Sequence, residues 1–275
     1  MFARSLAQTA ASTPHVSLLG LSYRPGIIDY AIVALFLWRY VRAPIALYQM
    51  PTTSFNPNMR LVSDDETIDA DVRAFIDKTE QALRSSGFGD PQHIAISQAS
   101  PLPALESLLE NPTTGDLANV VGMLQKNATT MSPVVSAVTF RSAFADGTLL
   151  QTSNSTHAGY WPDQPTHRNV VLPKVRDPAE LYRLHRARVS QKAASVTQSP
   201  LTRGATPQHR LAYATRQFLD STNFLIGCGY RKRSTKGVRL TARGATLTAW
   251  RRLFPWKQIG ERQRERAAAN VMRLV

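Results

Sequence analysis

Residues 26–50 constrain this 275-residue chain more than any other segment, because the run GIIDYAIVALFLWRYVRAPIALY within them is almost entirely apolar. Only Asp29, Arg39 and Arg42 place charges in it. A helix that spans a bilayer needs about 20 mainly apolar residues, so a spanning helix here has to include both arginines. Arginines near one end of such a helix can extend toward the lipid headgroups. We therefore predict a membrane-associated helix over residues 26–50.

Two other placements of this helix remain open. An apolar run of about 12 residues is also common in a helix buried in a soluble core. A helix lying in the plane of the membrane is the third placement, but Arg39 projects on the same side as Ile28 and Ile32, which leaves no clean polar face. Pro44 is expected to bend or end the helix.

The excess of arginine on the C-terminal side of this helix predicts that the bulk of the chain lies in the cytoplasm. The alternative is a soluble cytoplasmic protein without a membrane helix. Residues 1–25, which are predicted to be loose, contain no acidic residue and are rich in Ser, Thr and Ala, as mitochondrial transit peptides are. A mitochondrial location is therefore a further alternative if the source is eukaryotic.

The net charge of +14 is concentrated in the C-terminal part of the chain. Residues 1–165 contain 10 Lys and Arg against 14 Asp and Glu, whereas residues 166–275 contain 23 against 5. The two parts therefore carry net charges of −4 and +18. The positive charge of residues 166–275 attracts polyanions. The predicted partners are therefore an anionic membrane surface or a nucleic acid, and a protein partner is left unspecified.

Few residues point to metal or enzyme chemistry. A single cysteine, Cys228, excludes an intramolecular disulfide and a multi-cysteine zinc site within one chain. The spacing of His157, Asp163 and His167 fits no compact metal site, and polar loop residues ordinarily hydrogen-bond locally. The sequence contains no G-x-S-x-G, P-loop, G-x-G-x-x-G or H-E-x-x-H motif. We predict no metal, no cofactor and no catalytic residue, while a soluble enzyme without a recognisable motif stays an alternative.

Residues 60–173 are predicted to form an α+β domain that opens with a helix. The segment SDDETIDADVRAFIDKTEQALRSSG has the apolar periodicity of an amphipathic helix. Ser63 and Glu66 have the spacing of a capping box at its start, and Gly87 is the expected C-terminal stop.

Alternation of apolar and polar residues predicts strands in the rest of this domain. Strands are expected at residues 93–98 and 116–125, although a short helix is an alternative for the second. The clearest signal is VVSAVTFRSAFADGTLLQTSNS, in which Asp146-Gly147 predicts a two-residue hairpin turn and residues 148–153 the return strand. One helix packed on a small antiparallel sheet accounts for the pattern.

Residues 174–275 are predicted to form a basic, mainly helical region with one β-hairpin. Asp177 and Pro178 provide a cap and a first-turn proline for a helix that contains His185, which we expect to be solvated or capping. Residues 195–208 are expected to be a mobile polar linker, after which another helix begins.

The β-hairpin is expected between these helices and the C-terminus. The segment RKRSTKGVRL indicates two strands with a turn at Lys236-Gly237, Thr241 caps a helix that runs to Phe254, and a basic helix ends the chain. The stretch GVRLTARGATL resembles the wing-to-helix junction of winged-helix DNA-binding proteins. That resemblance implies nucleic-acid binding, but a winged helix needs two tightly joined helices before its wing, and a polar segment of 14 residues separates the candidates here.

Three blocks, FADGTLLQTSNS, LYRLHRARV and TARGATLTAWRRLFPWKQI, resemble a group of uncharacterised bacterial proteins that have an N-terminal apolar segment. The resemblance implies a bacterial, membrane-associated protein. It transfers no catalytic or binding residue to this chain.

The expected fold class is α+β, with an N-terminal apolar helix, a small antiparallel sheet with a packed helix, and the basic C-terminal region. The predicted function is that of a non-enzymatic, membrane-associated protein whose basic region contacts anionic lipid or a partner. A nucleic-acid-binding protein with a winged-helix-like element and a soluble enzyme are the alternatives. The residues expected to contact anionic lipid or nucleic acid are Arg231, Lys232, Arg233, Lys236, Arg251 and Arg252.

Overall fold

The computed structural model describes residues 16–18, 21–23, 26–50, 54, 58–62, 68–97, 104–126, 131–155, 161–202, 204–253 and 255–274. By its contacts, the chain divides into two compact units, Met1–Ala43 and Pro44–Val275. In the first unit, β1 (Val16–Leu18) and β2 (Leu21–Tyr23) pair antiparallel within the segment that was expected to be loose.

The apolar run forms helix α1 (Ile27–Tyr48), as predicted. The backbone N–H of Gly26 donates to the Oδ2 atom of Asp29 at 2.7 Å, which closes the first turn. Pro44 lies inside the helix and does not end it. None of the side chains of α1 is buried, and the helix is long and apolar enough to cross a membrane.

Helix α2 (Ala70–Ser85) is the predicted amphipathic helix, but it begins later than expected. Its N-cap is Asp69, whose side chain accepts hydrogen bonds from two backbone N–H groups of the first turn. The predicted capping box of Ser63 and Glu66 lies outside the described residues. Gly87 ends the helix as predicted, in a left-handed conformation (φ 86°) that costs glycine little.

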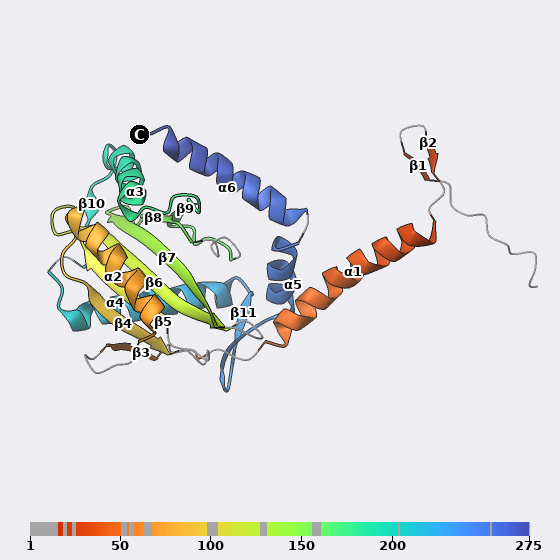
Figure 1. Ribbon diagram of the computed structural model, residues 1–275, viewed down its shortest axis with the longest axis horizontal. Coiled ribbons are helices and arrows are strands. Elements are labelled where there is room, and N and C mark those ends of the chain that lie inside the picture. The colour runs from red at the N-terminus through yellow and green to blue at the C-terminus, as the bar shows by residue number, and fades with distance from the viewer. Residues whose placement is uncertain are drawn as a thin grey trace, which may run out of the picture. The chain divides into compact units, whose positions relative to one another are not determined.

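The second unit is built around one sheet, in which the strands follow the order β3-β4-β5-β6-β7-β8-β9 (Figure 1). Neighbouring strands are antiparallel except β8 and β9, which are parallel. The α+β class is confirmed, although the sheet is larger than the predicted one and includes β5, which no sequence pattern predicted. The strands are β3 (Asn58–Leu61), β4 (Gln92–Ser97), β5 (Ala104–Glu110), β6 (Leu117–Lys126), β7 (Met131–Phe144), β8 (Leu149–Ser153) and β9 (His167–Val171).

The β7–β8 hairpin is confirmed, but its turn differs from the predicted one. The N–H of Gly147 donates to the carbonyl oxygen of Phe144 at 2.9 Å, and the N–H of Phe144 donates to that of Thr148 at 2.9 Å. The loop therefore contains three residues, 145–147, with Gly147 at φ 77°, rather than a two-residue turn at Asp146-Gly147. Three-residue hairpin loops commonly place a left-handed residue after a type I turn, which is the position that glycine takes here.

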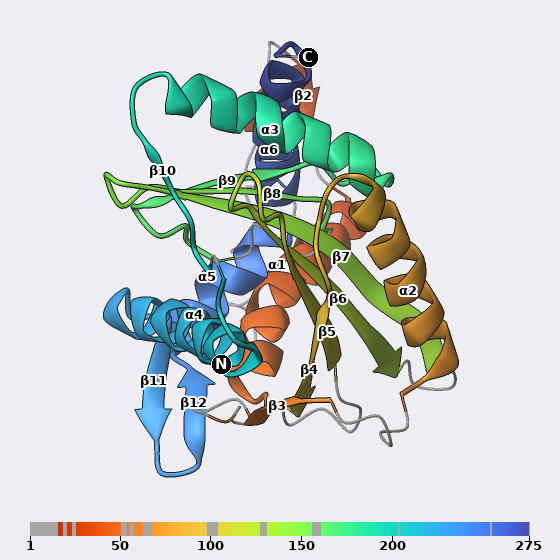
Figure 2. The ribbon, with the colours of Figure 1, turned by 90° about the vertical axis from the view of Figure 1, so that its left-hand side faces the viewer.

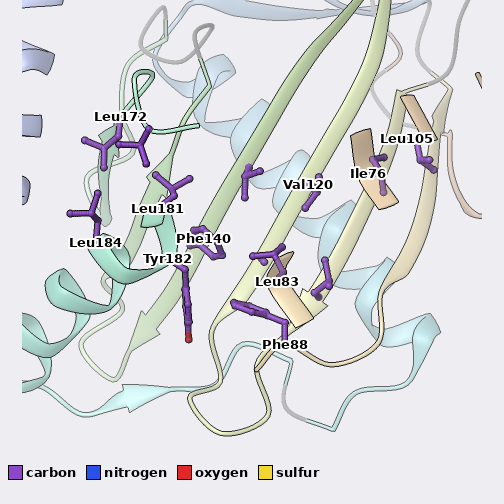
Figure 3. Close-up of a cluster of buried hydrophobic side chains, with 14 of the residues drawn as sticks. Ile76, Leu83, Phe88, Leu105, Val120, Phe140, Leu172, Leu181, Tyr182 and Leu184 are labelled. Atoms are coloured by element: carbon purple, nitrogen blue, oxygen red, sulfur yellow. The ribbon is translucent and has the colours of Figure 1, made fainter. Parts of the chain in front are cut away.

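Different helices cover the two faces of the sheet, as Figure 2 shows for α2 and α4. Helices α2 and α3 (Pro178–Ala193) pack on one face, and helix α3 begins as predicted, with Asp177 as its cap. Helix α4 (Pro207–Gly227) packs on the other face through Ala214 and its neighbours. The largest buried cluster joins α2, α3 and the sheet (Figure 3), and it includes Ile76, Leu83, Phe88, Val120, Phe140, Leu181 and Leu184.

The segment between α3 and α4 is attached to the sheet, which corrects the predicted mobile linker. Within it, β10 (Gln198–Ser199) pairs with the end of β7. The Nε2 atom of Gln198 donates to Asp116 Oδ1 at 2.7 Å and to the carbonyl oxygen of Thr114 at 2.8 Å. Because α3 and α4 lie on opposite faces of the sheet, they do not form the tight helix pair of a winged helix.

A hairpin and two helices complete the chain: β11 (Arg231–Ser234), β12 (Gly237–Leu240), α5 (Ala242–Arg251) and α6 (Trp256–Met272). Ser234 pairs with Gly237, so Thr235 and Lys236 form the turn, one residue earlier than predicted. Helix α5 ends at Arg251, before the predicted end at Phe254. Helix α6 contacts β9 and α3, which places the C-terminal helix against the main sheet unit.

Candidate anion-binding surface

The candidate surface begins where α4 ends and the chain turns into the hairpin. Gly229 adopts a left-handed conformation at φ 71°, and the N–H of Tyr230 donates to the carbonyl oxygen of Leu225 at 2.9 Å. This turn starts β11, and the hairpin extends beyond α4 (Figure 2).

Thr241 and Gly244 fix the helix that follows the hairpin. The Thr241 Oγ1 atom accepts from the N–H of Gly244 at 2.9 Å and donates to the carbonyl oxygen of Gly229 at 2.6 Å, which confirms Thr241 as the cap. A Cβ atom at residue 244 would lie 2.0 Å from the carbonyl oxygen of Tyr230. The Thr-x-x-Gly part of the winged-helix-like stretch therefore serves the close packing of α5 on the hairpin.

The three predicted cations of the RKR run differ in exposure. Arg231 is half-buried, and its guanidinium carbon lies 5.0 Å from the centre of the Trp161 ring. Burial lowers the pKa of Arg231. Lys232 and Arg233 are exposed, and Arg233 Nη2 donates to Asn223 Oδ1 at 3.2 Å. Arg231 thus packs partly against the protein, whereas Lys232 and Arg233 are exposed, and contact of the run with anionic lipid or nucleic acid stays a prediction.

Arg251, the last residue of α5, lies close to the base of the hairpin. Its guanidinium carbon lies 5.8 Å from the centre of the Tyr230 ring, which is itself 6.4 Å from the Trp161 ring. The structure therefore brings Arg231 and Arg251 onto two neighbouring aromatic rings. Arg252 caps the C-terminus of α5, where a positive charge interacts favourably with the helix dipole.

The hairpin also carries exposed cations that were not among the predicted contact residues. Lys232 pairs with Arg239 across the two strands, and like charges in that position repel each other. An anion between them would relieve this repulsion. The exposed cations of the hairpin and α5, which we call the basic surface, are Lys232, Arg233, Lys236, Arg239, Arg243, Arg251 and Arg252.

Exposed apolar side chains accompany these cations at the junction of α5 and α6. Trp250 is 40% exposed, Trp256 is 53% exposed and Ile259 is 42% exposed. These three side chains line one surface hollow together with Arg251 and Lys257. Indole rings beside cations are typical of surfaces that meet a membrane interface.

A buried polar network contains the residues that most resemble a catalytic set. Ser142 Oγ donates to Asp116 Oδ1 and lies 2.9 Å from His185 Nε2, while His185 Nδ1 lies 2.9 Å from Thr152 Oγ1. Asp116, Ser142, Thr152 and His185 are fully buried. His185 is therefore neither solvated nor capping, because α3 turns this side chain onto the sheet.

The charges of this network favour a structural role. Burial lowers the pKa of His185 to about 3, so its ring is neutral at neutral pH. Burial alone would raise the pKa of Asp116, but His185, Ser142 and Arg186 together hold that pKa below its ordinary value. Because Asp116, Ser142 and His185 are closed off from solvent, a substrate has no access to them. The network joins α3 and the sheet, and its members are too far apart in sequence for a local motif to indicate it.

No known protein family, curated protein or solved structure matches this chain. Within the described ranges, no group of three or more His, Cys, Asp and Glu side chains is placed to hold a metal ion. Of the three residues weighed as metal ligands, His157 lies outside the described residues. Asp163 Oδ1 accepts from Asn169 Nδ2 at 2.8 Å, a local hydrogen bond of the expected kind.

Proposed function

We propose that this chain is a membrane-anchored, non-enzymatic protein whose basic surface contacts anionic lipid headgroups. The observation that carries the proposal is α1, a helix of 22 residues with large apolar side chains and no buried residue. Apolar surface left in water costs roughly 25 cal/mol per Å², and a bilayer removes that cost. Arg39 and Arg42, near the C-terminal end of α1, favour a cytoplasmic location for the larger unit.

The basic surface supports lipid headgroups as the second contact. A cation near an anionic leaflet contributes about 1 kcal/mol, so several exposed cations act together where a single one has little effect. The exposed indoles of Trp250 and Trp256 add side chains that prefer the boundary between headgroups and acyl chains.

Membrane fractionation of the full-length chain tests the anchor. The membrane pellet is washed in high salt and then in alkaline carbonate, and we expect the protein to remain in the pellet through both washes. Release by high salt would make the attachment peripheral and electrostatic. Recovery in the soluble fraction alone would overturn the proposal.

A second experiment isolates the basic surface. In the full chain, Leu35→Glu and Leu37→Glu interrupt the apolar run of α1 without adding cations, so the remaining binding to phosphatidylserine vesicles is expected to be peripheral. Adding Lys232→Gln, Lys236→Gln and Arg239→Gln is expected to weaken that binding about 100-fold, since each cation contributes about 1 kcal/mol.

The matched control removes three exposed cations elsewhere, through Lys78→Gln, Arg84→Gln and Arg176→Gln. It loses the same net charge, and we expect its affinity for the vesicles to fall about threefold at most, because distant exposed charges are screened. Equal losses in both triple variants would show that net charge, and not this surface, governs binding.

Nucleic-acid binding is the second candidate, and the projecting basic hairpin is the observation that favours it, because a two-stranded ribbon fits the major groove. Fluorescence anisotropy with duplex DNA at low salt separates the two candidates. Binding that weakens in the hairpin triple variant would support the nucleic-acid alternative. Absence of binding by the wild-type chain would remove it.

A further inference from the structure

A cavity of about 370 Å³ lies between α4 and the sheet, on the face opposite α2 and α3. Its floor contains polar side chains from four neighbouring strands: Glu106 of β5, Asn119 of β6, Arg141 of β7 and Gln151 of β8. Cavities of this size are within the range that holds small ligands. None of the residues of the basic surface lines the cavity, so ligand binding in it does not depend on the contact of that surface with lipid headgroups.

Strand register brings these four side chains into one row. Asn119 lies opposite Thr139, which places it diagonally from Arg141 on the same face. Arg141 lies directly opposite Gln151, and its Nε atom donates to Gln151 Oε1 at 3.3 Å. Diagonal neighbours in antiparallel strands are about 7–8 Å apart, a span that one small molecule can bridge.

Asn119 lines the cavity and contains an unused hydrogen-bond acceptor. The side chain is 7% exposed, and its Nδ2 atom donates to Glu106 Oε1 at 2.5 Å. Its Oδ1 atom is buried and has no hydrogen-bond partner among the described residues. An unsatisfied buried polar atom is costly, so this atom is suited to accept a hydrogen bond from a ligand donor.

Arg141 presents a positive charge that no carboxylate of the described residues neutralises within ion-pair distance. The side chain is half-buried. Burial raises the pKa of Glu106, and the charge of Arg141 opposes that rise. Burial, followed by the same charge, lowers the pKa of His167 at the cavity edge. A guanidinium in this position is a strong, geometrically specific partner for a carboxylate.

The walls of the cavity are largely apolar. Helix α4 and the loop before β9 supply aromatic rings on the side that faces the polar floor. A ligand that fits both surfaces has an apolar ring and polar groups along one edge. The apolar lining residues include Met59, Ile96, Leu108, Trp161, Phe218 and Phe224.

We propose that this cavity binds a small amphipathic carboxylate, with its carboxylate on Arg141, a hydrogen-bond donor on Asn119 Oδ1 and its apolar ring between the sheet and α4. The polar floor determines the position of the two polar groups, and the apolar walls select the ring.

Three related compounds test the two polar contacts separately. Indole-3-acetate has a ring, a carboxylate and an N–H donor. Naphthalene-1-acetate lacks the donor, and indole-3-ethanol lacks the carboxylate. Binding is measured by isothermal titration calorimetry with the full chain in nanodiscs of uncharged lipid, after subtraction of the heat with empty nanodiscs. We expect indole-3-acetate to bind at least about tenfold more tightly than indole-3-ethanol, because the latter loses a charge-assisted hydrogen bond.

Arg141→Gln is the decisive variant. It is expected to reduce the affinity for indole-3-acetate to that for indole-3-ethanol and to leave the latter unchanged, while Arg141→Lys restores part of the preference. Arg183→Gln, an exposed arginine on the opposite face, is the matched control and is expected to behave as wild type. Naphthalene-1-acetate is expected to bind several-fold more weakly than indole-3-acetate, in line with the loss of one hydrogen bond.

Equal affinities for indole-3-acetate and indole-3-ethanol would overturn the assignment of the carboxylate to Arg141. Absence of binding by all three compounds at millimolar concentration would overturn the proposed ligand class. Binding that Arg141→Gln and Arg183→Gln weaken equally would place the ligand outside this cavity.

Discussion

The two faces of the sheet differ in how their buried polar groups are paired. On the face covered by α2 and α3, Asp116, Ser142 and His185 satisfy one another within a filled hydrophobic cluster. On the face covered by α4, Asn119 and Arg141 border a cavity, and the Oδ1 atom of Asn119 has no hydrogen-bond partner among the described residues. The comparison indicates that the first face stabilises the fold, while the second is available for binding.

The largest expected effect comes from removing a ring on the filled face. Phe140 is fully buried against Phe88, Tyr182 and His185, so Phe140→Ala should lower the free energy of unfolding by about 3–5 kcal/mol. Phe218→Ala enlarges a cavity that already exists and should cost below about 1.5 kcal/mol. Urea unfolding of the full chain in detergent measures both, and equal losses would remove the distinction between the faces.

The loss of folding stability at acid pH should also come mainly from the face covered by α2 and α3. The pKa of His185 is about 3 in the folded protein, against an ordinary value of 6.5. As the pH falls from 6.5 toward 3, the unfolded chain takes up a proton that the folded chain excludes. Stability should therefore fall by up to about 1.4 kcal/mol per pH unit in that interval.

Urea unfolding at neutral pH and near pH 5 tests this loss in wild type, His185→Gln and His167→Gln. The loss should shrink clearly in His185→Gln. It should change little in His167→Gln, because this side chain on the other face is only half-buried. A loss of the same size in His185→Gln and wild type would contradict the assignment.

The smallest expected effect distinguishes two tyrosine hydroxyls. Tyr182 donates to Asp116 Oδ2 at 2.9 Å and accepts from Asn111 Nδ2 at 3.2 Å, so Tyr182→Phe should cost about 1–2 kcal/mol. The Tyr213 hydroxyl is buried and makes no hydrogen bond of ordinary geometry among the described residues, and the nearby Arg141 side chain only opposes the rise in its pKa that burial causes. Tyr213→Phe should therefore change stability by under about 0.5 kcal/mol. Thermal unfolding of the two variants side by side makes the comparison, and a larger loss in Tyr213→Phe would reverse it.

Signals contained in a few adjacent residues predicted the corresponding parts of the fold. Gly87 marks the C-terminus of a helix, and the Asp177-Pro178 pair and Thr241 each mark an N-terminus, through local backbone chemistry. All three predictions are confirmed. Strand β5 was missed because six of its seven residues are buried, so the sequence lacks the alternation of a half-exposed strand.

The candidate sites depend on contacts between distant residues, and the sequence indicated them only in part. His185 meets Ser142 across 43 positions and Thr152 across 33, a pairing that helix periodicity alone does not reveal. The RKR run correctly marked a basic hairpin, but the packing of Arg231 on Trp161 required the fold. Arg141 was visible as a charged residue in an alternating strand, whereas its neighbours Glu106 and Asn119 belong to other strands.

The alternation along β5, β6 and β7 has a consequence for how this protein can diversify. In β7, Phe140 and Ser142 belong to the filled face, while Arg141 between them belongs to the cavity. Substitutions at cavity positions therefore alter what the floor recognises while leaving the adjacent core positions unchanged. Duplicated copies of such a chain can acquire new ligand preferences through single replacements without first acquiring a new scaffold.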